Sequence, residues 1–268
     1  MQVEDDELSR LVLKRLGPSR GAVQAIILFG GLAMGHERSW ASDIDLIVVL
    51  DDGCGDEEIA EARSRLRALN PSMRPRGLLG HLFSSIEQAT GMFSGPFVCR
   101  ESDLHIGDFK SIFGTSALMT KLLAPTGLVL GGATTTFKCI YGRAPEMSIP
   151  RRRSLHVLKS LIMCFLLSIG GIILCPIAVE GLKYVLEAMK WAIYATYYYA
   201  RGEIRPLQEI ASVLATRGPF PWKTLAKELL RLRKELKRAG LALLLAPLGV
   251  LMLHIKAIGR PESLYKSE

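Results

Sequence analysis

The stretch Ala25-Ile26-Ile27-Leu28-Phe29-Gly30-Gly31, followed after eleven residues by Asp43-Ile44-Asp45 and Leu46-Ile47-Val48-Val49-Leu50, decides how this chain folds. The two apolar runs have the length and the branched side chains of neighbouring buried strands. The glycine pair marks the end of the first strand. Asp43 and Asp45 stand two positions apart at the start of the second strand, so their side chains lie on the same face.

Two carboxylates on one strand face need a partner. At roughly 5 Å and an effective dielectric of about 20, they repel each other by about 3 kcal/mol. A cation between them removes this cost, and Mg²⁺ is the usual partner of carboxylates and substrate phosphates. Glycines at a strand end let backbone amides approach a phosphate closely. The pattern therefore predicts a metal-dependent phosphoryl or nucleotidyl transfer site.

This motif resembles the signature of the polymerase-β-type nucleotidyltransferase superfamily, most closely its minimal and antibiotic-modifying members from prokaryotes. The resemblance implies an α/β (α+β) fold with a small mixed sheet. It also implies transfer of a nucleoside monophosphate from a nucleoside triphosphate to an acceptor hydroxyl, with two Mg²⁺ ions at Asp43 and Asp45. The segment Thr136–Gly142 resembles the strand ending in Tyr-Gly that closes this domain.

The phosphate loop departs from the family pattern at two positions. Gly31 stands where many members carry serine, and Met34 where many carry arginine. Arg38, further along the loop, is the candidate replacement for that cation. The resemblance thus assigns nucleotide binding to Gly30, Gly31, Arg38 and Ser42.

The family supplies a third carboxylate from the next strand, which activates the acceptor hydroxyl. A helix with Asp56 as its N-cap is predicted to lead into a strand at Gly77–Phe83, which holds His81 but no acid. The acids further along the chain are Glu87, Glu101, Asp103 and Asp108. Asp103 and Glu101, next to a predicted strand at 97–101, rank first as catalytic residues. Loss of the third acid is the alternative.

The pattern changes between residues 145 and 150, where alternating strands and short helices give way to long helical stretches. We therefore predict a nucleotidyltransferase domain over residues 1–145 and an all-helical domain over 150–268. In the antibiotic-modifying members such helical parts help to form the acceptor pocket, and the resemblance implies the same role here.

The run Ser160–Val179 is twenty uncharged residues long, enough to cross a membrane. Gly170-Gly171 and Pro176 interrupt it, and basic residues on both sides give no preferred orientation. We therefore expect this run to be buried in protein, with membrane attachment as the alternative.

The net charge of +8 favours anionic partners. A helix with the apolar stripe Leu225, Leu229, Leu232 and Leu236 carries several of the cations on its other side, typical of a solvated face, with RNA or membrane binding as alternatives. Five scattered cysteines fit neither a disulfide framework nor a zinc site, and together with an acidic start they indicate the reducing cytoplasm.

Three functions follow from these observations. The first is a Mg²⁺-dependent nucleotidyltransferase acting on a small molecule or a protein. The second is a catalytically weak nucleotide-binding or partner-binding module, as in toxin–antitoxin pairs. The third is an RNA-tailing enzyme. The sequence favours no particular nucleotide, acceptor or oligomeric state.

Overall fold

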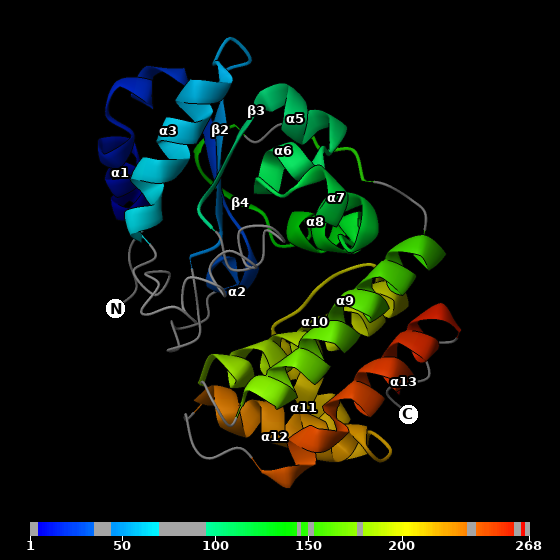
Figure 1. The fold of residues 1–268 in the computed structure, drawn as a ribbon. Helices are drawn as coiled ribbons and strands as arrows, with labels where there is room; N and C mark the ends of the chain where they lie inside the picture. The colour runs from blue at the N-terminus through cyan, green and yellow to red at the C-terminus, as the bar shows by residue number, and fades with distance from the viewer. Residues whose placement is uncertain are drawn as a thin grey trace. The chain divides into compact units, whose positions relative to one another are not determined.

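The computed structural model describes residues 5–34, 44–69, 95–143, 146–149, 153–175, 179–234, 240–259 and 264–265. The chain divides into two compact units (Figure 1). The sheet unit contains the described residues before residue 123 and those from 136 to 150, and the helical unit contains residues 123–135 and those after 150. Residues 123–135, predicted to lie in a first domain over 1–145, therefore belong to the helical unit.

The sheet unit is a mixed α/β structure, as the sequence predicted. Its elements are α1 (Asp5–Leu16), η1 (Gly17–Ala22), β1 (Val23–Leu28), α2 (Gly30–Ala33), β2 (Leu46–Leu50), α3 (Asp56–Leu66), η2 (Arg67–Leu69), β3 (Phe97–Arg100), α5 (Glu101–Ile106), α6 (Phe109–Phe113), α7 (Ala117–Leu122) and β4 (Lys138–Gly142). The predicted strand at Gly77–Phe83 lies outside the described residues.

The four described strands form one sheet in the order β3-β2-β1-β4. β1 is antiparallel to both β2 and β4, and Leu28 pairs with Leu46 on one side and with Lys138 on the other. β3 is parallel to β2, with Ile47 level with Phe97. The end of β1 therefore meets the starts of β2, β3 and β4 at one edge of the sheet.

Burial of both faces holds the sheet in place. Every residue of β2 is buried, as its unbroken apolar run predicts. The strand side chains that point to one face of the sheet pack against Leu8, Val12 and Leu16 of α1 and against Ile59 and Leu66 of α3. Together they form one apolar core. Figure 1 shows α1 and α3 on one side of the sheet and α5 and α6 on the other.

One detail of the sheet unit differs from the sequence-based expectation, and another explains a predicted feature. Gly55, not Asp56, is the N-cap of α3, and its amide donates to the Glu58 carboxylate at 2.8 Å. The Asp56 carboxylate instead accepts from Arg100 at 2.6 Å. The chain turns at Gly142 with a φ of +68°, and a Cβ there would lie 1.9 Å from the Gln24 carbonyl oxygen, so only glycine fits the Tyr-Gly strand end.

The helical unit is built from α8 (Thr126–Thr134), α9 (Arg153–Leu174), α10 (Val179–Arg201), α11 (Leu207–Arg217), α12 (Trp222–Lys234), η4 (Leu241–Leu245) and α13 (Ala246–Ile258). α8 can pack within the helical unit because two of its residues are glycines, which have no side chain to clash with their neighbours. A Cβ at Gly131 would lie 2.1 Å from the Tyr198 hydroxyl, and one at Gly132 would lie 2.2 Å from Ile204 Cδ1. This contact is non-local, which explains why a boundary read along the chain missed it.

The predicted break at Gly170-Gly171 is wrong, because α9 continues through both glycines to Leu174. A Cβ at Gly171 would lie 2.7 Å from the Gly181 carbonyl oxygen on α10. The glycine thus permits close packing of two helices rather than ending one. Each predicted stripe residue of α12 that the structure describes is buried, namely Leu225, Leu229 and Leu232.

Some basic residues of α12 form ion pairs within the helical unit. Arg233 of α12 and Lys190 of α10 both form ion pairs with Glu187 of α10, which is buried. Burial opposes ionisation of Glu187, but the two cations outweigh it and lower the pKa of this carboxyl. Arg231 pairs with Glu228. These internal pairs weaken the RNA-binding reading of this helix.

A buried polar pair joins α9 to α13. Ser160 Oγ lies 2.8 Å from His254 Nε2, and His254 Nδ1 lies 2.8 Å from the Val250 carbonyl oxygen. The carbonyl accepts, so Nδ1 carries the proton and neutral Nε2 accepts from the serine hydroxyl. Burial lowers the pKa of His254 from its ordinary value of 6.5 to about 4.

This pair should make the protein acid-sensitive. The unfolded chain takes up a proton at His254 below pH 6.5, whereas the folded chain does so only below about pH 4. The free energy of unfolding therefore decreases as the pH is lowered across that window. We expect His254 to account for roughly 3 kcal/mol of lost unfolding free energy over that window. Urea titrations at several pH values measure it. His254→Gln should flatten the slope, and equal slopes for both proteins would contradict the assignment.

Candidate functional site

The carboxylate of Asp45 lies against Gly30 at the edge of the sheet where β1 ends and β2 begins. Phe29 donates its amide to the Asp45 carbonyl at 3.0 Å, which continues the β1–β2 pairing by one step. Gly30 then turns with a φ of +68°, and a Cβ there would lie 2.7 Å from Asp45 Oδ2. The glycine conformation thus makes the space that the carboxylate occupies, and it brings the glycine motif and Asp45 together.

The Gly30 amide is engaged by Thr136, a residue the sequence analysis named only as part of the closing strand. Gly30 N–H donates to Thr136 Oγ1 at 3.1 Å across 106 positions of sequence. Gly30 therefore makes room for the Asp45 carboxylate, and its amide is bonded to Thr136. Gly31 is the glycine that remains for the expected phosphate contact. A hydroxyl just before a predicted strand was the only sequence signal for Thr136.

Aromatic side chains support this edge from within the sheet unit. The Phe29 ring lies between those of Phe97 and Phe137, with centroids 6.1 and 6.2 Å away. Phe97 packs edge-on against Phe113 at 4.8 Å. These three strand-end phenylalanines give the turn at Gly30 a rigid base, which suits a site that must hold a carboxylate in a fixed position.

The remaining predicted ligands of this site are Asp43, Ser42 and Arg38, together with His81 and Glu87, and all lie outside the described residues. Asp43 precedes Asp45 by two positions. Within the described part of the chain, no group of three or more His, Cys, Asp or Glu side chains forms a metal cluster. Asp45 fits a metal chemically: it is a hard oxygen donor fixed beside a backbone turn.

The expected third acid is not where the sequence analysis put it. Because β3 is parallel to β2, Asp45 precedes the paired strands while Glu101 follows them, about 20 Å further along. Ser102 donates its amide to Asp52, at that far end, at 2.9 Å. The structure therefore does not bring Glu101 or Asp103 to Asp45. The strand at 97–100 was predicted correctly, but its direction was not readable from the sequence.

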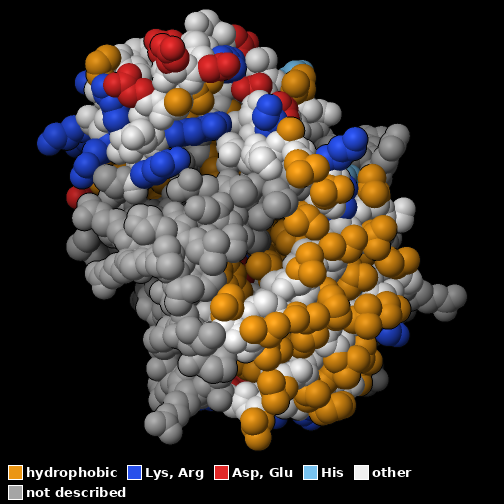
Figure 2. All heavy atoms as spheres, viewed as in Figure 1, with side chains coloured by type: hydrophobic (Ala, Val, Ile, Leu, Met, Phe, Trp, Pro, Cys, Tyr) orange, Lys and Arg blue, Asp and Glu red, His pale blue; other side chains and the backbone are white. Residues whose placement is uncertain are grey.

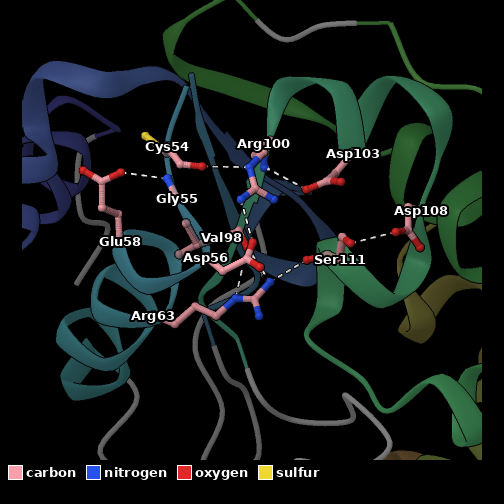
Figure 3. A network of polar contacts seen from close by, with 10 residues as sticks. All are labelled: Cys54, Gly55, Asp56, Glu58, Arg63, Val98, Arg100, Asp103, Asp108 and Ser111. Atoms are coloured by element: carbon pink, nitrogen blue, oxygen red, sulfur yellow. Dashed lines mark hydrogen bonds and ion pairs between the residues drawn. The ribbon is translucent and has the colours of Figure 1, made fainter. Parts of the chain in front are cut away.

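Asp103 instead belongs to a structural network (Figure 3). Its carboxylate accepts from the Arg100 amide at 3.2 Å, which caps α5. The Arg100 guanidinium donates to the Cys54 carbonyl and to Asp56, and this contact lowers the pKa of Asp56. Asp108, another of the candidate acids, accepts from the Ser111 hydroxyl at 2.7 Å.

Arg63 fastens the same end of the sheet to α6. Its guanidinium donates to the carbonyls of Val98 and Ser111 (Figure 3). Burial lowers the pKa of Arg63, whose donors are nonetheless satisfied by these carbonyls. The cluster of charged groups at this end thus joins β3, α3, α5 and α6 and has a sufficient structural role.

Removing the two acids should therefore affect stability and not chemistry. We expect Glu101→Gln and Asp103→Asn to leave nucleotide binding and turnover within about twofold of wild type. Asp103→Asn should cost about 1 kcal/mol of unfolding free energy, because it weakens a helix cap. Thermal melting and turnover assays on both variants check this. A rate loss of 100-fold without loss of stability would restore these residues as catalytic.

Two of the cysteines are buried and unreactive. All five are free, and Cys99 and Cys164 are buried. Burial raises the pKa of both thiols to about 12, so they stay protonated and unreactive near neutral pH.

Comparison with known proteins places this geometry in a family. Residues 8–84 match the family model described as "Nucleotidyltransferase domain". The whole chain is similar in fold to the crystal structure of the spectinomycin adenyltransferase AAD(9) from Enterococcus faecialis with ATP and spectinomycin. That similarity covers 96% of this chain and 98% of that one, with a TM-score of 0.55 and 11% sequence identity. No curated protein sequence matches the chain.

The matched residues contain β1, the Gly30 turn, Asp45 and β2, so the family match and the site coincide. The described fold, a small mixed sheet with a helical part, is the one that the similar adenyltransferase adopts over nearly its full length. The predicted resemblance is confirmed: residues 8–84 of this chain match the nucleotidyltransferase domain family.

Proposed function

We propose that this protein transfers a nucleoside monophosphate from a nucleoside triphosphate to a hydroxyl group of a small molecule. The observation that carries the proposal is the contact between the Asp45 carboxylate and the Gly30 turn inside the nucleotidyltransferase domain. Support for a small acceptor comes from the similar adenyltransferase, which was crystallised with ATP and spectinomycin.

Mg²⁺ is part of the proposal, held by Asp45 and by Asp43 two positions earlier. When bound, the metal supplies charge stabilisation at the α-phosphate and lowers the pKa of the acceptor hydroxyl. Asp45 contributes a fixed carboxylate, because Gly30 and the β1–β2 pairing hold its backbone. Gly31, Ser42 and Arg38 are the proposed contacts of the triphosphate.

The reaction is an in-line displacement at phosphorus. The acceptor oxygen forms a bond to the α-phosphorus, the bond between that phosphorus and the bridging α–β oxygen breaks, and pyrophosphate leaves. The acceptor proton passes to a base. Glu101 and Asp103 are excluded from that role by their place at the other end of the sheet, and the protein's main contribution is positioning and charge stabilisation.

Label transfer tests the proposal directly. The full chain is incubated with Mg²⁺ and each of the four α-³²P-labelled nucleoside triphosphates, in parallel with spectinomycin, total RNA or a protein extract. We expect a labelled small molecule and released pyrophosphate, and neither with Asp45→Asn. Labelled RNA would favour the tailing enzyme. Nucleotide binding without any transfer would favour the binding module.

A further inference from the structure

The helical unit exposes a broad apolar face, which Figure 2 shows as hydrophobic side chains gathered over α9 and α13. Among the described residues, one helix, Ser154–Leu174 within α9, is long and apolar enough to cross a membrane, and 33% of its most apolar window is buried. One side of this helix packs within the unit, and the other side carries exposed residues such as Ile162, Leu166 and Ile173. We call this surface the α9–α13 face.

The large hydrophobic side chains that are exposed on this face are all Leu or Ile. They are Leu155, Leu158, Ile162, Leu166, Ile169 and Ile173 on α9, Leu241 and Leu244 on η4, and Leu248, Ile255 and Ile258 on α13. Their spacing on α9 follows the helical period, so they form one stripe. At roughly 60–120 Å² for a whole side chain, the exposed parts amount to on the order of 500 Å². Apolar patches of that size are often functional.

The charged side chains of this face are cationic and lie at one end of it. Gly171 packs on Gly181 and Cys164 lies near Glu187, so α9 and α10 run antiparallel. Thr196 and Arg201 of α10 donate in that order to the carbonyls of Leu253 and Tyr265, so α13 runs parallel to α10 and antiparallel to α9. Lys159 and Lys256 therefore lie at the same end of the face. α9, η4 and α13 contain no aspartate or glutamate.

We propose that the α9–α13 face binds the surface of an anionic lipid bilayer, with its apolar end inserted among the acyl chains and its cationic end at the headgroups. A face without acids complements an anionic surface. A second protein is less suited to it, because protein interfaces are anchored by Trp, Tyr and Arg within a polar rim. On these three elements the large exposed hydrophobic residues include neither Trp nor Tyr.

Co-sedimentation with vesicles tests the proposal on the full chain. We expect the wild type to pellet with phosphatidylcholine vesicles containing phosphatidylglycerol, and much less with phosphatidylcholine alone. Leu166→Glu combined with Ile173→Glu should weaken binding at least about 100-fold, because both side chains are more than half exposed at the apolar end. Lys256→Ala should weaken binding to anionic vesicles about fivefold and leave binding to neutral vesicles unchanged.

The matched control is Val213→Glu on α11, an exposed apolar position on a different helix. It should bind vesicles like the wild type, and circular dichroism and thermal melting should show all variants folded. Equal binding by the double variant would overturn the proposal, as would a wild type that ignores anionic vesicles. A wild-type dimer that the double variant converts to monomer, without vesicle binding, would assign the face to a second copy. Resistance to alkaline carbonate extraction would mean that α9 spans the bilayer, and would also overturn it.

Discussion

Asp45→Asn is expected to abolish Mg²⁺-dependent turnover while the protein stays folded. The amide keeps the size of the side chain, so it still fits the space beside Gly30, but it removes the anionic ligand. Even outer-sphere partners of a metal typically contribute 10–100-fold. Loss of a direct ligand should therefore lower the rate on the order of 1,000-fold and weaken nucleotide binding in the presence of Mg²⁺. Asp43→Asn should behave alike.

Calorimetric titration of nucleotide with and without Mg²⁺ measures the binding effect, and label transfer measures the rate. The matched control is Asp52→Asn, the same substitution beyond the opposite end of β2, where Asp52 accepts from the Ser102 amide. That variant should bind nucleotide like the wild type. Unchanged nucleotide affinity in both Asp43→Asn and Asp45→Asn, with Mg²⁺ present, would refute a metal site at this edge of the sheet.

Gly30→Ala should damage the same site by steric means. The added Cβ would lie 2.7 Å from Asp45 Oδ2, and the φ of +68° at this position is unfavourable for alanine. Backbone strain of this kind costs roughly 1–2 kcal/mol, and the carboxylate must also move. Since a displacement of about 1 Å in a catalytic group can cost 100-fold in rate, we expect a loss of that order together with lower stability.

Gly21→Ala is the control for this substitution, because a Cβ at Gly21 has no heavy atom within 4 Å. It should leave turnover and the melting temperature close to wild type. Full activity in Gly30→Ala would mean that the Asp45 carboxylate need not keep its contact with this turn. Comparing the two variants in one assay separates the local clash from the general cost of replacing a glycine.

The sequence by itself determined the first two strands and the glycine turn at the end of the first. Apolar runs such as Leu46–Leu50 are local signals, since a strand buried on both faces must be apolar along its whole length. The glycine motif and the Asp-x-Asp motif are also local, and a match over residues 8–84 confirms the family that they predicted. The helical second half was evident from its periodicity for the same reason.

Only the tertiary structure decided which distant residues meet. Strand direction put Glu101 and Asp103 at the far end of the sheet, because the parallel pairing of β3 with β2 depends on a connection that no local pattern encodes. Long-range packing brought Thr136 to the Gly30 amide and Tyr198 to Gly131. The exposure of α9 could not be determined from composition either. The same apolar sequence is compatible with an outer face that is covered by protein, covered by lipid or left exposed.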